Sequence, residues 1–120
     1  MDLNLKGKTA IVFGGNKGLG AASAMALAAE GANVFLTARN AEDLQRTADE
    51  ITAAQGVKVG LLALDITEES SGERIVEAAL EEFDRIDILV NAAGAARGSV
   101  FHDIDDQVWR DAFELKFLGA

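Results

Sequence analysis

The chain of 120 residues is long enough for one domain, which would remove about two-thirds of its unfolded surface from water. It contains no cysteine and no proline, so a disulfide framework, a thiolate metal site and a cysteine nucleophile are excluded. Its net charge of −9 argues against general nucleic-acid binding, which needs clustered lysine and arginine side chains.

The first residues, MDLNLKGKTA, lack the charged and then apolar pattern of a secretion leader. No apolar run approaches the roughly 20 residues that are needed to cross a bilayer. We therefore expect a soluble, cytoplasmic protein that has neither a membrane nor a nucleic acid as its partner.

Short apolar runs that are rich in valine, isoleucine and leucine alternate with helical patterns along the chain. The runs are residues 9–13 (TAIVF), 33–38 (NVFLTA), 57–64 (VKVGLLAL) and 86–91 (IDILVN). Runs of this kind are typical of parallel strands that are buried on both faces. No linker or repeat interrupts the alternation, which indicates one compact unit.

The segments between the strands have helical patterns with expected N-caps at Asn40 and Thr67, and Glu68 and Glu69 suit the start of the helix after Thr67. Apolar residues recur every three or four positions in the second helix (Leu44, Ala48, Ile51) and in the third (Ile75, Ala79, Phe83). The alternation predicts an α/β fold with a doubly wound parallel sheet of about four strands, for which we favour the order 3-2-1-4.

The first strand leads into a glycine turn, residues 13–20 (FGGNKGLG). At the start of a helix, unpaired N–H groups and missing side chains let a phosphate approach, and the carboxyl end of a parallel strand is where such folds bind ligands. Gly14, Gly18 and Gly20 do not have the G-x-G-x-x-G spacing, so a tight turn with close helix packing is the alternative interpretation.

The second strand ends in TARN, where an acidic side chain would favour NAD. Arg39 offers a guanidinium that can pair with a 2′-phosphate, and Lys17 in the glycine turn can add a second positive charge. These residues predict NADP(H) rather than NAD(H). The alternative is that Arg39 is a solvated residue at the start of the next helix.

The last segment, residues 104–120, has the pattern of a helix with two apolar faces. Ile104, Val108, Ala112 and Leu115 share one face, and Trp109, Phe113 and Phe117 share the other. A helix with two apolar faces is normally buried on both. We therefore expect a homo-oligomer with Trp109 and Phe113 between chains; the alternative is packing within the same domain. A fourth strand at the sheet edge would add unpaired backbone groups that attract another chain.

The only histidine, His102, has the carboxylates of Asp103, Asp105 and Asp106 beside it. No paired ligand spacing accompanies them, so we expect a solvated side chain and no metal site.

Four segments, GGNKGLG, ARN, LDIT and DILVNAAG, together resemble the short-chain dehydrogenase/reductase family over nearly the whole chain. The resemblance implies a Rossmann-type fold, with residues 1–120 as a single dinucleotide-binding domain that is incomplete at its C-terminal side. It implies that Asp65 holds the adenine, that the segment from Asn91 to Gly94 borders the cofactor, and that members commonly pair through the last helix. The cofactor-binding residues expected in this way are Gly14, Asn16, Lys17, Gly18, Leu19, Gly20, Arg39, Asn40, Asp65, Ile66, Asn91, Ala93 and Gly94.

The sequence also departs from the family pattern. Phe13 replaces a usual threonine, Ala92 replaces the second asparagine of the NNAG element, and Lys116 lies where the catalytic asparagine is usual. The family uses a tyrosine followed four residues later by a lysine as its acid/base pair, and this chain has no tyrosine. We therefore assign no catalytic residue.

The resemblance implies that the parent enzyme transfers a hydride between NADP(H) and a carbonyl or alcohol substrate, and that this chain alone is inactive. One alternative is a non-catalytic fragment with weak nucleotide binding and self-assembly. Another is a phosphoacceptor signalling domain that uses Asp65, but the first strand ends in FGGN and lacks the acidic pair that would hold a divalent cation.

Overall fold

Strands and helices alternate through the computed structural model, which describes residues 5–15, 18–65, 71–92 and 114–117. The elements are β1 (Thr9–Phe13), α1 (Gly18–Ala29), β2 (Asn33–Ala38), α2 (Ala41–Gln55), β3 (Val59–Ala63), α3 (Ser71–Phe83), β4 (Ile88–Asn91) and β5 (Glu114–Phe117). The four predicted strands are all present, and the third and fourth begin two residues later than predicted.

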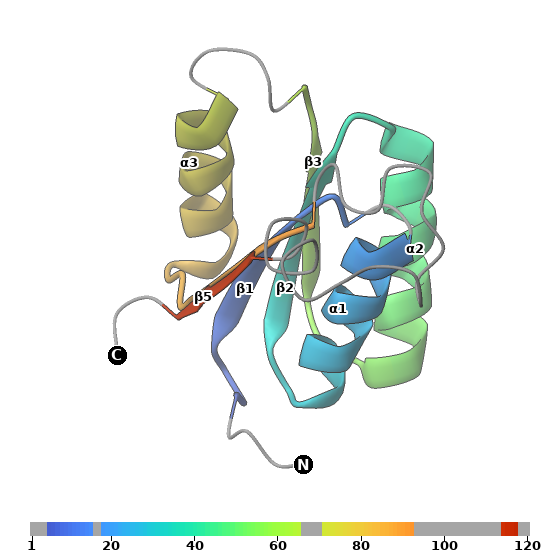
Figure 1. Cartoon of the computed structure of the whole chain (residues 1–120). Coiled ribbons are helices and arrows are strands. Elements are labelled where there is room, and N and C mark those ends of the chain that lie inside the picture. Colours follow the sequence, from blue (N-terminus) through green and yellow to red (C-terminus); the bar gives the residue numbers. More distant parts are fainter. Residues whose placement is uncertain (1–4, 16–17, 66–70, 93–113, 118–120) are drawn as a thin grey trace, which may run out of the picture.

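The strands form one sheet in the order β3-β2-β1-β4-β5. The pairs β1–β2, β2–β3 and β1–β4 are parallel, so the predicted doubly wound order 3-2-1-4 is confirmed. Helices α1 and α2 cover one face of the sheet and α3 covers the other (Figure 1). This layering follows from right-handed crossovers, which place successive connections over a parallel sheet.

The fifth strand corrects the prediction for the end of the chain. Residues 114–117 pair antiparallel with β4, so the predicted helix is wrong over these residues, and β4 is an inner strand rather than an edge strand. The outer backbone groups of β4 need hydrogen-bond partners. The sequence ELKF alternates polar and apolar residues, which is the period of a strand, and so can supply them. Residues 104–113 of the predicted helix lie outside the described residues.

Alternate strand residues build a core on each side of the sheet. On one side Ala10 and Val12 of β1 pack in a cluster that includes Leu44, Ala48 and Ile51 of α2, as the periodicity predicts. On the other side Ile11 packs with Ile75 and Ala79 of α3, and the predicted third member of that stripe, Phe83, is partly buried against them.

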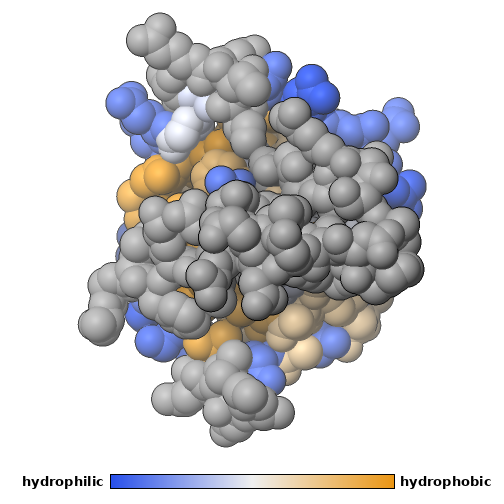
Figure 2. Space-filling model, in the orientation of Figure 1, coloured by the Kyte–Doolittle hydropathy of each residue, from blue (hydrophilic) through white to orange (hydrophobic). Residues whose placement is uncertain are grey.

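Helix α3 leaves part of its surface apolar. Val76 and Leu80 are exposed, and Figure 2 shows hydrophobic surface on the side of the molecule where α3 lies. None of the helices in the described part of the chain is long and apolar enough to cross a membrane.

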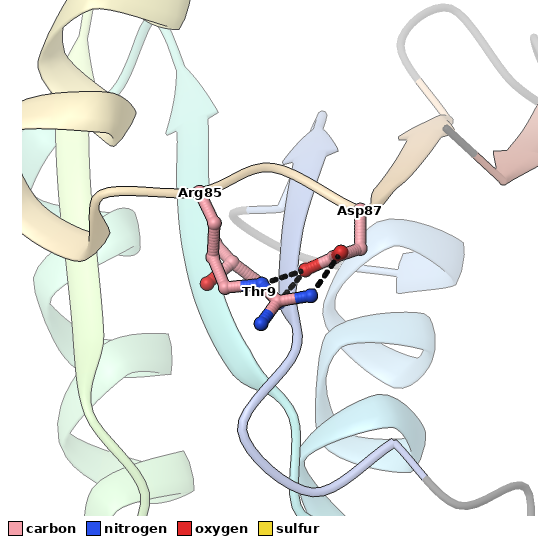
Figure 3. A network of polar contacts seen from close by, with 3 residues as sticks. All are labelled: Thr9, Arg85 and Asp87. Atoms are coloured by element: carbon pink, nitrogen blue, oxygen red, sulfur yellow. Dashed lines mark hydrogen bonds and ion pairs between the residues drawn. The ribbon is translucent and has the colours of Figure 1, made fainter. Parts of the chain in front are cut away.

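Polar contacts join β1 and β4 at the edge where both strands begin (Figure 3). The buried carboxylate of Asp87 accepts a hydrogen bond from Thr9 N at 2.9 Å, and Asp87 N donates to Thr9 O at 2.9 Å. Arg85 donates to the same carboxylate through Nε at 2.8 Å and through a terminal nitrogen at 2.7 Å. The contacts hold the two strands in register far from the ends that carry the predicted site.

Candidate nucleotide-binding site

The predicted site residues gather at one edge of the sheet because the four parallel strands end there. The glycine turn follows β1, Arg39 and Asn40 follow β2, Asp65 lies just after β3, and Asn91 ends β4. Phe13, the last residue of β1, is in register with both Thr37 and Asn91. This is the edge at which open α/β sheets bind ligands.

Strand β2 holds the beginning of the glycine turn. The carbonyl of Thr37 accepts hydrogen bonds from Gly14 N at 2.8 Å and from Gly15 N at 3.3 Å. Gly14 has a φ of +81°, a conformation that a side chain would strain. The N–H groups of Gly14 and Gly15 are therefore occupied by the protein and are not available to a phosphate.

Gly18 and Gly20 have different reasons to be glycine. A Cβ on Gly20 would overlap the carbonyl oxygen of Gly14, so close packing of α1 against the turn explains this residue. Gly18 has a φ of +58°, and a Cβ there would meet open space, which leaves room for a ligand. Close packing of the helix therefore explains Gly20, and a role of Gly18 toward a ligand stays a prediction.

The start of α1 can receive an anion. Helix α1 begins at Gly18, and no acidic residue lies in its first turn. The partial positive charge at the helix N-terminus is therefore not offset by a local carboxylate. The predicted site residue Leu19 lies in this turn and is half-buried.

A short connection carries Arg39 from β2 into α2. Asn40 is the N-cap of α2, as predicted, because its Oδ1 accepts a hydrogen bond from Asp43 N at 3.0 Å. Asp43 pairs with Arg46 at 2.9 Å. Arg39 is exposed and makes no ion pair within the described part of the chain, so its charge is available at this edge.

The ends of β3 and β4 complete the edge. Asp65 and Asn91 are both half-buried. Ala92 N donates to Phe13 O at 2.9 Å, which ties the end of β4 to the end of β1 beside the glycine turn. The fold thus brings together segments that are far apart in the sequence.

Several predicted residues lie outside the described part of the chain, so their predictions stay untested. They are the expected site residues Asn16, Lys17, Ile66, Ala93 and Gly94, the expected N-cap Thr67, the histidine that we expect to be solvated, His102, and Trp109 and Phe113 of the expected contact between copies. Lys116 lies in β5. Within the ranges that are described, no group of histidine, aspartate or glutamate side chains could hold a metal ion.

Two features at the sheet ends were missed from the sequence. The role of the Thr37 carbonyl has no sequence signal, because any residue supplies a carbonyl and only the register brings this one to Gly14. The contacts between Asp87, Arg85 and Thr9 had a signal, since Asp87 is a charged residue inside the predicted apolar run 86–91 and a buried charge needs a partner such as the neighbouring Arg85.

A parallel sheet of order 3-2-1-4, with a glycine turn at the carboxyl end of its first strand, defines a nucleotide-binding fold of the Rossmann type. Residues 8–120 match the family described as short chain dehydrogenase. The chain belongs to the short-chain dehydrogenase/reductase family, whose members are oxidoreductases that bind a nicotinamide dinucleotide.

Relatives and solved structures agree with this family. The oxidoreductase YgcW of Escherichia coli is 39% identical over 117 residues, which cover 98% of this chain and 44% of YgcW. L-sorbose reductase from Gluconobacter frateurii, solved with NADPH and L-sorbose, has a TM-score of 0.76 and 33% identity, over 92% of this chain and 42% of the reductase. Carveol dehydrogenase from Mycobacterium avium, solved with NAD, has a TM-score of 0.71 and 28% identity, over 90% and 43% of the two chains. The chain therefore spans less than half the length of each of these three proteins.

Proposed function

We propose that this chain is the NADP(H)-binding domain, incomplete at its C-terminal side, of an oxidoreductase that transfers a hydride between NADP(H) and a carbonyl or alcohol substrate. When bound, the cofactor supplies or accepts the hydride. In this proposal the start of α1 receives the pyrophosphate, Asp65 holds the adenine, and Arg39 pairs with the 2′-phosphate. The residues that act on the substrate belong to the remainder of the protein.

The exposed guanidinium of Arg39 carries the preference for NADP(H). Arg39 is one residue beyond β2, and β2 is the strand whose carbonyl holds the glycine turn. A 2′-phosphate at this edge would gain a bidentate, charge-assisted partner. A 2′-hydroxyl would instead find no acidic side chain at Ala38, Arg39 or Asn40 to accept its hydrogen bond.

Cofactor titration tests the assignment. Arg39→Ala in the complete gene product is expected to weaken NADPH binding by about tenfold or more, because a hydrogen-bonded charge is lost. NADH binding should hardly change. Arg74→Ala is the matched control, since Arg74 is also exposed but lies on α3, which covers the other face of the sheet from α2. Equal affinity for the two cofactors in the unaltered protein, or an unchanged ratio in Arg39→Ala, would show that the cofactor assignment is wrong.

We also propose that the 120 residues alone do not catalyse the reaction. Hydride transfer needs a positioned proton donor on the substrate oxygen, and the chain has no tyrosine to supply it. The purified chain should therefore consume no NADPH with a panel of aldehydes and ketones, while the complete gene product does so. Turnover by the 120 residues above the uncatalysed rate would rule this out.

A further inference from the structure

Asn40 lies where helix α2 meets the connection that carries Arg39. Its side chain caps α2, and its backbone directly follows Arg39. The carbonyl of Asn40 also accepts a hydrogen bond from Leu44 N at 3.1 Å, and Leu44 is fully buried in the core. The cap therefore attaches the residue after Arg39 to a helix that cannot move without disturbing the core.

The residue before Arg39 is fixed as well. Ala38 is the last residue of β2, and its carbonyl accepts a hydrogen bond from Leu64 N at 3.0 Å. Arg39 is thus an exposed residue between two neighbours whose backbone or side-chain groups are held by hydrogen bonds. An arginine side chain loses rotational freedom when it binds a ligand, and a mobile backbone would lose freedom in addition. The total entropy lost on binding is therefore smaller when the backbone is already fixed.

We propose that Asn40 is a positioning residue for cofactor choice: by capping α2 it fixes the backbone from which Arg39 reaches the 2′-phosphate, and so it favours NADP(H) over NAD(H). This inference rests on the proposed function. Arg46 pairs with Asp43, so that one of the two carboxylates in the first turn of α2 is offset by a cation, while Glu42 is the other.

Three substitutions separate capping from direct contact. Asn40→Ala removes the cap, Asn40→Ser keeps a capping oxygen without the amide group, and Asn40→Asp keeps a cap but adds a negative charge. For each variant of the complete gene product, the dissociation constants for NADPH and NADH are measured by titration. Amide hydrogen exchange of Asp43 is measured without cofactor and reports the cap itself.

The inference predicts different results for the three variants. Asn40→Ala should speed exchange at Asp43 and raise the NADPH dissociation constant by up to about fivefold, because binding must then restore the order that the cap supplied, with little change for NADH. Asn40→Ser should restore both values. Asn40→Asp should protect Asp43 yet weaken NADPH binding, because its charge opposes the phosphate.

Other results would overturn the inference. If Asn40→Ser protects Asp43 but binds NADPH as weakly as Asn40→Ala, the amide contacts the phosphate directly and the cap is not responsible. If Asn40→Ala weakens both cofactors equally, or neither, Asn40 does not determine the choice. Arg39→Ala is measured beside these variants. If the ratio of NADPH to NADH affinity stays unchanged in Arg39→Ala as well, the proposed function has failed; if that ratio changes, only the inference about Asn40 has failed.

Discussion

Asp87 is the one ionisable side chain that is buried among the described residues, with 6% of its surface exposed. The hydrogen bonds from Arg85 lower the pKa of its carboxyl group, Thr9 N adds to this, and burial opposes it. An aspartate in the unfolded chain has a pKa of about 3.9. Because the folded-state pKa is lower, the carboxylate stabilises the fold above the unfolded value, and this stability is lost as the pH falls through the folded-state pKa.

Substitution of Asp87 tests the clamp at the amino ends of the strands. Asp87→Ala leaves Thr9 N buried without its acceptor, so the free energy of unfolding should fall by about 1–3 kcal/mol in urea titrations at neutral pH. Asp87→Asn keeps an acceptor oxygen, so at neutral pH it should lose less stability than Asp87→Ala. Because its side chain does not titrate, its free energy of unfolding should also fall less on acidification than that of the unaltered chain. Arg85→Ala is the control, because it leaves the bond between Thr9 and Asp87 in place, and its effect should be smaller than that of Asp87→Ala. The same acid sensitivity in Asp87→Asn and in the unaltered chain would contradict this role.

The packing of α3 on the sheet depends on a glycine in β3. A Cβ on Gly60 would lie 2.7 Å from Phe35 Cδ2, which is closer than packed atoms approach. The Phe35 ring cannot simply move aside, because it makes an edge contact with Phe83 of α3, with ring centroids 6.5 Å apart. Gly60 thus gives Phe35 the space to pack between the sheet and the helix.

Gly60→Ala should therefore destabilise the chain by about 1–3 kcal/mol, the usual effect of overpacking a core. Gly72→Ala is the matched control. Gly72 is exposed in α3 with nothing near the position of a Cβ, so this change should raise stability by about 0.5–1 kcal/mol. Thermal unfolding measures both variants, and a Gly60→Ala chain as stable as Gly72→Ala would show that the contact is not tight.

At the scale of elements, the sequence predicted those parts of the fold that depend on local patterns. The strands were visible as apolar runs, and the cap at Asn40 as a polar residue before a periodic helix. The last helix was predicted from a periodicity that includes Leu115, yet residues 114–117 form a strand. A segment of four residues fits both the helical and the strand periodicity, and its pairing with β4 favours the strand.

For the whole molecule, the sequence could predict which segments meet but not how the site is completed. Parallel topology was enough to place the glycine turn, Arg39, Asp65 and Asn91 at one edge. Which N–H groups of the turn remain for a ligand depends on the carbonyl of Thr37, and that is a matter of register between strands.

The central claim is that the carboxyl edge of this sheet binds NADP(H), and amide hydrogen exchange of the complete gene product with and without NADPH tests it most directly. The account predicts slower exchange with cofactor in peptides that cover residues 13–20, 38–40 and 91–94. Peptides that cover residues 85–88, at the opposite edge, should be unchanged. Unchanged exchange at the carboxyl edge with saturating NADPH, or protection at the opposite edge alone, would contradict the account.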